Sequence, residues 1–232
     1  MMAALDSFSN GSSPDGRGTE AARHAMVVSQ LRTSAVSDVR VVAAMAQVER
    51  ERFLPATHGA LAYRDVQVPL GEGRAQNAPL ATGRLLTQAR ITPADRVLLI
   101  GAAGGYTAAV VARLAASVVA VECNAQLAGR AREALAGIPN VVVVEGPLSE
   151  GCSADAPYDV LVIDGAVEEV PKTLIAQLHP QARVVTGLID RGVIRLASGV
   201  RTAGGFRLQH FADVDCVPLP GFEQPRGFQF PG

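Results

Sequence analysis

The chain has 232 residues, of which 48% are hydrophobic and 19% are charged, so it holds enough apolar side chains for a large core and is not globally disordered. Its 21 basic and 22 acidic residues give a net charge of −1, which supplies no basic field for nucleic acid or an anionic membrane. Tryptophan is absent and 4% of the residues are aromatic, so a stacking surface for single-stranded nucleic acid is not expected either.

The cysteines and histidines lack the patterns of a disulfide framework or a metal site. The three cysteines have no C-x-x-C spacing, and the four histidines form no H-E-x-x-H pair, so we expect no metal. No apolar run approaches the ~20 residues of a membrane span, and the first residues lack the basic-then-apolar order of a signal peptide. These features favour a reduced, cytoplasmic protein.

The N-terminal part is predicted to consist of a flexible tail, residues 1–22, and a helical segment with a loop, residues 23–78. The tail is rich in glycine, serine and turn-forming residues. Apolar residues at helical spacing predict two helices between about Ala21 and Glu51, with Ser37 as the cap of the second. The segment 57–78 is interrupted by prolines and glycines and shows no period, so an irregular loop is expected there.

Residues 79–216 are predicted to form the core, in which short apolar strands alternate with helices. The predicted strands are Arg96–Ile100, Ser117–Glu122, Val141–Glu145, Tyr158–Ile163 and Arg183–Thr186. The first predicted helix of the core follows the turn at Gly105 and ends near Ala116. The other two predicted helices cover Asn124–Leu135 and Pro171–Leu178. This alternation indicates an α/β fold with a mostly parallel sheet that is covered on both faces.

Two further predicted strands, Gly192–Ser198 and Phe206–Val214, have no helix between them. They are expected to form an antiparallel hairpin at the edge of the sheet. Residues 217–232 follow as a C-terminal extension.

The glycine-rich turn after the first core strand is the first candidate binding feature. Its sequence is Gly101-Ala102-Ala103-Gly104-Gly105, and such a turn lets the backbone approach a ligand while the next helix offers free N–H groups. Glu122 ends the next strand about twenty residues later, where a carboxylate can accept the ribose hydroxyls of a nucleoside. Simple tight packing of the turn and a solvent-exposed glutamate are the alternatives.

The turn does not have the G-x-G-x-x-G pattern of a dinucleotide site, because alanine occupies position 103. A dinucleotide-dependent oxidoreductase is therefore disfavoured. S-adenosylmethionine carries no phosphate and is suited to a shorter turn, and the C-terminal hairpin points the same way by analogy of fold.

Several segments resemble the protein-L-isoaspartate O-methyltransferase family. Arg96–Tyr106, with the sequence RVLLIGAAGGY, resembles the first cofactor motif, and Tyr158–Ala166 followed by Val170-Pro171 is similar to the fourth strand and its turn. The N-terminal signature is matched by Met26-Val27, Gln30–Arg32, Ala44-Met45, Val48, Arg50–Pro55 and Ala62–Asp65. The likeness covers about residues 23–200, and the ending resembles a shorter, divergent bacterial branch.

This resemblance implies a Rossmann-like S-adenosylmethionine-dependent methyltransferase. The implied reaction transfers a methyl group to the α-carboxylate of an isoaspartyl residue in a damaged protein, so the implied partner is an isoaspartyl-containing protein or peptide. A carboxylate is already ionised at neutral pH, so the reaction needs positioning rather than a general base. The oligomeric state stays open.

The resemblance also implies site residues. The implied cofactor-binding positions are Gly101, Ala102, Ala103, Gly105, Glu122, Cys123, Gly146, Pro147, Leu148 and Asp164. The implied substrate positions are Arg74, Asn77 and Pro79, and Asn77 stands where the family has its substrate-orienting serine. For Arg74 the preferred interpretation is a solvent-exposed loop arginine, and pairing with a carboxylate is the alternative.

Four features depart from the family pattern. Leu99 stands where the first motif opens with an acid, and Ala103 replaces its central glycine. Pro147 replaces the acid after the third strand, while Ala75 and Asn77 replace the hydroxyl residues of the substrate loop. Each lost hydrogen bond to a charged or buried group weakens binding by ~1–3 kcal/mol. A catalytically impaired methyltransferase-fold protein with a binding or scaffold role is therefore the alternative function.

Overall fold

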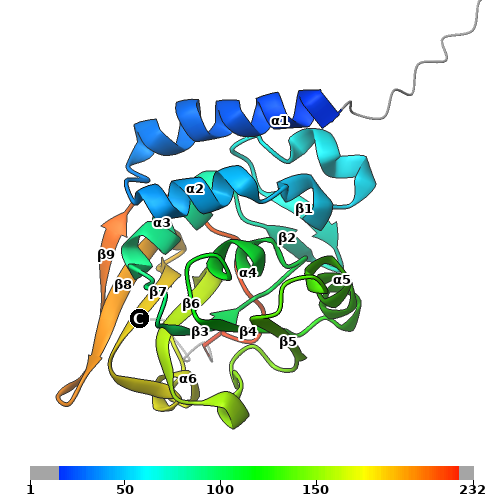
Figure 1. The fold of residues 1–232 in the computed structure, drawn as a ribbon. Coiled ribbons are helices and arrows are strands. Elements are labelled where there is room, and N and C mark those ends of the chain that lie inside the picture. The colour runs from blue at the N-terminus through cyan, green and yellow to red at the C-terminus, as the bar shows by residue number, and fades with distance from the viewer. Residues whose placement is uncertain (1–15, 225–232) are drawn as a thin grey trace, which may run out of the picture.

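A seven-stranded sheet forms the centre of the structure, a computed structural model that describes residues 16–224 (Figure 1). The strand order is β5-β4-β3-β6-β7-β8-β9. These strands are β3 Arg96–Ile100, β4 Ser117–Glu122, β5 Val141–Glu145, β6 Tyr158–Val167, β7 Leu178–Asp190, β8 Val193–Thr202 and β9 Gly205–Ala212. The five strands β5, β4, β3, β6 and β7 run parallel to one another. At one edge, β8 pairs antiparallel with β7, and β9 pairs antiparallel with β8. The α/β class, the mostly parallel sheet and the antiparallel edge hairpin are thus confirmed.

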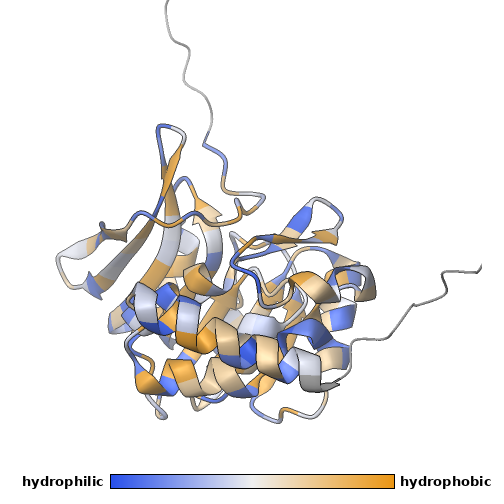
Figure 2. Cartoon of the chain, turned by 90° about the horizontal axis from the view of Figure 1, so that it is seen from above, coloured by the Kyte–Doolittle hydropathy of each residue, from blue (hydrophilic) through white to orange (hydrophobic). Residues whose placement is uncertain are grey.

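Helices cover the sheet on both sides. They are α1 Gly16–Ala25, α2 Val39–Gln47, α3 Pro79–Ala89, α4 Tyr106–Val111, α5 Ala125–Leu135 and α6 Lys172–Ala176. In Figure 1, α1 and α2 lie together as an outer layer beyond α3 and α4, and α6 lies on the opposite side of the sheet. The N-terminal helices carry both hydrophobic and hydrophilic residues (Figure 2), and α2 buries Val41, Val42, Ala44 and Met45, as expected for a helix with one buried face. Of the helices that the structure describes, none has the length and apolar character needed to cross a bilayer.

Strand β3 shows why the parallel strands are continuous apolar runs. Val97 and Leu99 belong to the cluster under α2, α3 and α4, whereas Leu98 and Ile100 belong to the cluster on the other face. Successive side chains of a strand point to opposite sides, and here the side chains on both sides are packed into a hydrophobic cluster. This arrangement leaves no solvated face on β3, and it brings the turn at residue 101 to the edge where β4 and β6 also end.

Two details of the N-terminal helices differ from the prediction. Asp38, not Ser37, caps α2, since its carboxylate accepts a hydrogen bond from the Arg40 N–H at 2.8 Å. Helix α1 begins at Gly16, inside the segment predicted to be a tail, and residues 1–15 lie outside the described residues.

The expected irregular segment contains a short antiparallel hairpin, β1 Val68–Gly71 and β2 Arg74–Gln76. Its two-residue turn has positive φ at both Glu72 (55°) and Gly73 (68°). This backbone matches the type I′ turn that joins two strands of a tight hairpin. The hairpin fixes the place of Arg74, its first residue after the turn, which is important for the site described next.

Candidate active site at the ends of strands β3, β4 and β6

The turn of residues 101–105 connects β3 to α4 and is pressed against neighbouring backbone. A Cβ atom on Gly104 would lie 2.4 Å from the carbonyl oxygen of Phe53, so only glycine fits there. Ala103 adopts a φ of +50°, a left-handed conformation that destabilises an alanine by about 1–2 kcal/mol. The alanine at the family's glycine position therefore keeps a backbone shape suited to glycine.

Glu122, at the end of β4, is fully buried and makes an ion pair with Arg74. The Arg74 Nε and Nη2 atoms donate to the two carboxylate oxygens at 3.3 and 3.0 Å. The backbone N–H groups of Ala103, Cys123 and Asn124 donate to the same carboxylate at 2.7, 3.1 and 3.1 Å. An ionised carboxylate has about four lone-pair positions, so these contacts use its accepting capacity fully.

The environment lowers the pKa of Glu122. Burial alone raises the pKa of this carboxyl, but the hydrogen bonds and charge of Arg74, together with the backbone N–H groups of Asn124 and Ala103, outweigh burial and bring it below its ordinary value. Glu122 is therefore a buried anion that needs its counter-ion.

Arg74 is buried, so the preferred interpretation of a solvent-exposed loop arginine is wrong. Its third nitrogen, Nη1, is also buried and has no hydrogen-bond acceptor among residues 16–224. A buried donor without an acceptor is unfavourable, and most buried polar atoms in folded proteins avoid this state. Arg74 thus keeps one donor nitrogen that an additional carboxylate could satisfy.

Asp164 is the second buried acid at this edge of the sheet and lies within β6. Asn77 donates to its Oδ1 at 2.9 Å, and the hydroxyl of Thr107 donates to its Oδ2. Burial raises the pKa of Asp164, although these two hydrogen bonds and the charges of Arg50 and Arg74 act in the opposite direction. Asp164 and Glu122 are thus shifted in opposite directions within one site.

The chain segment after β9 crosses the ends of the parallel strands, and we call residues 215–224 the C-terminal strap. In Figure 1 it is the red segment that runs from the β9 edge back to the centre of the sheet. Ala166 donates to the carbonyl of Val217 at 2.8 Å and accepts from the N–H of Leu219 at 2.9 Å. The side-chain oxygen of Asn77 accepts from the N–H of Val217 at 2.8 Å. Phe222, also in the strap, is buried on its own chain.

Leu219 fills the crevice next to the glycine-rich turn. A Cβ placed on Gly101 would lie 3.1 Å from Leu219 Cδ1 and 3.5 Å from Arg74 Nη2. A Cβ placed on Gly165 would lie 2.5 Å from Leu219 Cγ and 2.6 Å from the carbonyl oxygen of Val217. The place above the end of β3, next to the implied cofactor-binding position Gly101, is therefore occupied by protein atoms.

An open hollow lies next to Cys123, the residue that directly follows Glu122. It has a volume of about 460 Å³ and is lined by Cys123, Glu145, Gly146, Pro147, Leu148, Ser149, Pro220 and Gly221. Four of the predicted cofactor positions therefore line one cavity, with the strap on its other side.

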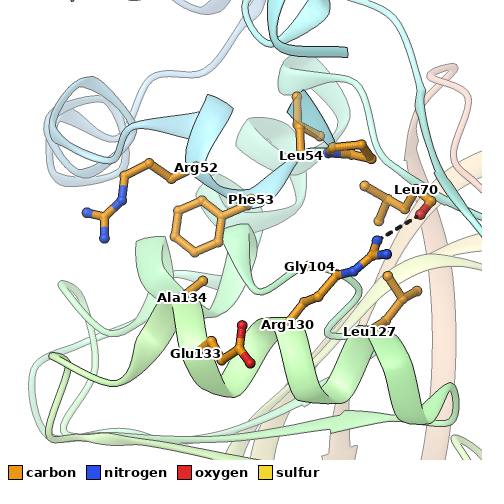
Figure 3. A pocket seen from close by; sticks show the side chains of 10 residues that line it. Arg52, Phe53, Leu54, Leu70, Gly104, Leu127, Arg130, Glu133 and Ala134 are labelled. Atoms are coloured by element: carbon orange, nitrogen blue, oxygen red, sulfur yellow. Dashed lines mark hydrogen bonds between the residues drawn. The ribbon is translucent and has the colours of Figure 1, made fainter. Parts of the chain in front are cut away.

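A different pocket lies on the other side of the turn, between α5 and the 3-10 helix Arg50–Phe53 (Figure 3). It has a volume of about 470 Å³. Arg130 reaches across it to the carbonyl oxygen of Leu70, and Phe53 points into it. Gly104 is the one residue of the glycine-rich turn that lines it, so this pocket is separate from the crevice at Gly101.

The structure brings together most of the predicted site residues. Glu122, Cys123 and Ala103 are joined by hydrogen bonds, and Asn77 joins Asp164 to the strap. Ala102, Gly105 and Pro79 take no part in these hydrogen bonds and do not line the hollow beside Cys123; Pro79 is the first residue of α3.

Sequence reasoning missed Arg50 as part of the site. Its side chain is fully buried, its guanidinium lies 4.7 Å from the ring centroid of Tyr106, and it donates a hydrogen bond to the carbonyl of Asn77. Burial lowers the pKa of Arg50, whereas Tyr106 and the charge of Asp164 raise it. The available signal was a run of charged residues directly before Phe53, which also fits an exposed helix end.

Comparison with known proteins identifies the family. A sequence model described as "Protein-L-isoaspartate(D-aspartate) O-methyltransferase (PCMT)" matches residues 22–224. The chain belongs to this family. A protein-L-isoaspartate O-methyltransferase of Methanoculleus marisnigri is 38% identical over 201 residues, which cover 86% of this chain and 91% of the relative. Protein-L-isoaspartate O-methyltransferase 1 of Rhodopseudomonas palustris is 38% identical over 226 residues, 96% of this chain and 92% of the relative.

Solved structures of this family share the fold. A protein-L-isoaspartate O-methyltransferase structure has a TM-score of 0.75 at 24% identity and covers 86% of this chain and 66% of its own. A putative family member from Plasmodium falciparum, in complex with S-adenosyl-L-homocysteine, has a TM-score of 0.70 at 17% identity and covers 85% of this chain and 97% of its own. The Rossmann-like methyltransferase fold predicted from the sequence is confirmed.

As they stand in the structure, the residues do not fit S-adenosylmethionine, the cofactor that the family implies. The accepting positions of Glu122 are used by Arg74 and three backbone N–H groups, so ribose hydroxyls would have to replace Arg74. Leu219 covers Gly101 and Gly165. Cofactor binding therefore requires a rearrangement of Arg74 and of the strap.

Proposed function

We propose that this chain is an S-adenosylmethionine-dependent carboxyl methyltransferase that acts on isoaspartyl residues of damaged proteins. The observation that carries the proposal is the buried carboxylate of Glu122 at the end of β4, which accepts a hydrogen bond from the backbone of the glycine-rich turn, an arrangement suited to ribose hydroxyls. The neighbouring guanidinium of Arg74 retains an unused donor nitrogen. The family membership over residues 22–224 supports the same reaction.

The chemistry suits the residues that are present. A substrate carboxylate is ionised at neutral pH, so the protein does not have to remove a proton from it. Its task is to hold the carboxylate in line with a methyl donor. Arg74 has the guanidinium geometry that binds a carboxylate through two parallel hydrogen bonds once it leaves Glu122.

The isoaspartyl-containing partner and a cytoplasmic location belong to the same proposal. Nothing in the net charge of −1 favours nucleic acid as a substrate. The oligomeric state is not part of the proposal.

A non-catalytic binding or scaffold protein is the second candidate function. The observation that favours it is the ion pair itself, because Arg74 and the strap occupy the positions that a nucleoside cofactor would need. On this second hypothesis the ion pair is structural, and the family's activity has been lost.

Methyl transfer from radiolabelled S-adenosylmethionine separates the two candidates. The full chain is incubated with an isoaspartyl peptide or with the same peptide containing ordinary aspartate. The proposed function predicts label in the isoaspartyl peptide alone, and Glu122→Gln is expected to reduce the transfer strongly. No label in either peptide, from protein shown to be folded and at saturating cofactor, would leave the non-catalytic candidate.

A further inference from the structure

Two side chains close the ligand-binding edge of the sheet, and they come from segments far apart in the sequence. Arg74 belongs to the β1–β2 hairpin, and Leu219 belongs to the C-terminal strap. We call them together the internal plug. Both contact the same position, because a Cβ on Gly101 would lie 3.1 Å from Leu219 Cδ1 and 3.5 Å from Arg74 Nη2.

We propose that the internal plug competes with a nucleoside ligand for the ends of β3 and β4, so that the chain binds its cofactor only after Arg74 leaves Glu122 and Leu219 leaves the crevice. This inference rests on the proposed function for the identity of the ligand. It goes beyond that function because it assigns a self-blocking role to two residues of this chain.

The hydrogen bonds of Glu122 explain why Arg74 and a nucleoside exclude one another. Two of its five N–H donors come from Arg74, and the other three come from backbone that stays in place. Ribose hydroxyls must therefore take the positions of the Arg74 donors. When Arg74 leaves, it becomes a buried cation without a partner unless it reaches another anion or solvent.

The positions of the two residues make such a movement feasible. Arg74 lies directly after the two-residue turn of a hairpin that pairs over only four and three residues. The strap is held near Leu219 by two backbone hydrogen bonds to Ala166 and by the Val217 N–H bond to Asn77. Short, local segments with few hydrogen bonds open more easily than the sheet beneath them.

The open hollow shows where a ligand would first arrive. It lies beside Cys123 and is bordered by Pro220 and Gly221, the residues that directly follow Leu219. A nucleobase that enters this hollow lies next to Cys123, which directly follows the acid that Arg74 pairs with, and next to Pro220, which directly follows Leu219. Displacing the strap there would expose Gly101 and Gly165 together, because Leu219 covers both.

Calorimetric titration of the full chain with S-adenosylhomocysteine tests the plug. Arg74→Met keeps the apolar length of the side chain but removes its donors, and Leu219→Ala removes the atoms over Gly101. Each variant is expected to bind about tenfold or more tightly than the unmodified chain, since the internal competitor is gone. Two matched controls lie away from the crevice: Arg183→Met, which loses an ion pair with Asp95, and Leu208→Ala on β9; both should bind like the unmodified chain.

Equal or weaker binding by both folded plug variants would overturn the inference. Adding Glu122→Gln to Arg74→Met should abolish the gain, whereas a gain that persists without the acid would place the ligand elsewhere and also overturn it. If Arg74→Met does not fold, Leu219→Ala decides alone.

Alkylation of Cys123, followed by mass spectrometry, gives a readout that is independent of heat. Cys123 is exposed and lines the hollow, whereas Cys216 is buried, and Cys152→Ser removes the remaining thiol. S-adenosylhomocysteine is expected to slow alkylation of Cys123 at a lower concentration in Leu219→Ala than in the unmodified chain, and equal concentrations would contradict the plug. Tight binding without methyl transfer by Leu219→Ala, which keeps Arg74, would refute the proposed function and leave the plug intact. Methyl transfer by the unmodified chain, without tighter binding by either plug variant, would support the proposed function and overturn the plug.

Discussion

Replacing Glu122 by glutamine removes the counter-ion of Arg74 while keeping the shape of the side chain. The pair is buried on both sides, with an Nη2–Oε2 distance of 3.0 Å, and it is supported by three backbone N–H groups. Breaking a buried pair from one side leaves an uncompensated charge and lowers the free energy of unfolding by about 3–5 kcal/mol. With an m-value of about 3 kcal/mol/M, the urea midpoint should fall by roughly 1–1.7 M.

An exposed ion pair of the same chain provides the control. Arg132 and Glu145 lie 3.9 Å apart with both side chains about half exposed, so Glu145→Gln should change the unfolding free energy by less than about 1 kcal/mol. If urea unfolding gives Glu122→Gln a loss as small as that of Glu145→Gln, the ion pair does not stabilise the fold as argued here.

The stabilisation by the Glu122–Arg74 pair should depend on pH in a direction that follows from the shifted pKa of Glu122. The folded-state pKa of Glu122 is lowered, so the pair stabilises the protein above the unfolded-state pKa of about 4.3 and this stabilisation is lost as the pH falls through the folded pKa. The stability difference between the unmodified chain and Glu122→Gln should therefore be constant from about pH 6 to pH 8 and shrink below about pH 4. A difference that grows on acidification would refute the assignment.

Three further changes probe the same edge of the sheet. Ala103→Gly removes a left-handed alanine and should raise the free energy of unfolding by up to about 1 kcal/mol in a urea titration, after allowance for the greater freedom of glycine in the unfolded chain; a loss would show that the backbone there is not strained. The raised pKa of Asp164 means that its protonation favours the folded state, so the unmodified chain should gain stability relative to Asp164→Asn as the pH falls from 7 toward 4, and the opposite trend would contradict its burial as an acid. Asn77→Ala removes the bonds to Asp164 and to the Val217 N–H, so hydrogen exchange at Val217 should accelerate at least tenfold, and an unchanged rate would mean that Asn77 does not hold the strap.

The core of the fold could be predicted from the sequence because its strands are buried on both faces. The runs Val97–Ile100 and Val118–Val121 are apolar throughout and are followed by Gly101 and Glu122, so the predicted limits of β3 and β4 agree with the structure. The parallel direction of these strands followed from their alternation with helices. Strand β6 extends to Val167, beyond the predicted end at Ile163, because its last residues pair with β7 and with the strap.

The β1–β2 hairpin was missed because its strands are too short for a period to be visible. Only Val68, Leu70 and their neighbours alternate between buried and exposed, and the turn depends on positive φ at Glu72 rather than on a familiar Asn-Gly pair. The capping residue of α2 was displaced by one position for a related reason, since Ser37 and Asp38 are both good caps and only the backbone chooses between them.

Part of the site could be predicted because it lies within one strand–turn–helix unit. Glu122 was identified by its distance along the chain from Gly101, and its contact with the turn follows from adjacent parallel strands. The partner of Glu122 could not be found in this way, because Arg74 lies 48 residues earlier, in the hairpin that the sequence pattern did not reveal. The same holds for Leu219, which reaches the crevice only because the strap returns across the sheet.

A crystal structure of the full chain soaked or grown with S-adenosylhomocysteine tests the central claim most directly. The account predicts the two ribose hydroxyls within hydrogen-bond distance of the Glu122 carboxylate, the Arg74 guanidinium withdrawn from that carboxylate, and Leu219 moved away from Gly101. A nucleoside bound at another place, or one bound while Arg74 still pairs with Glu122 and Leu219 still covers Gly101, would contradict it.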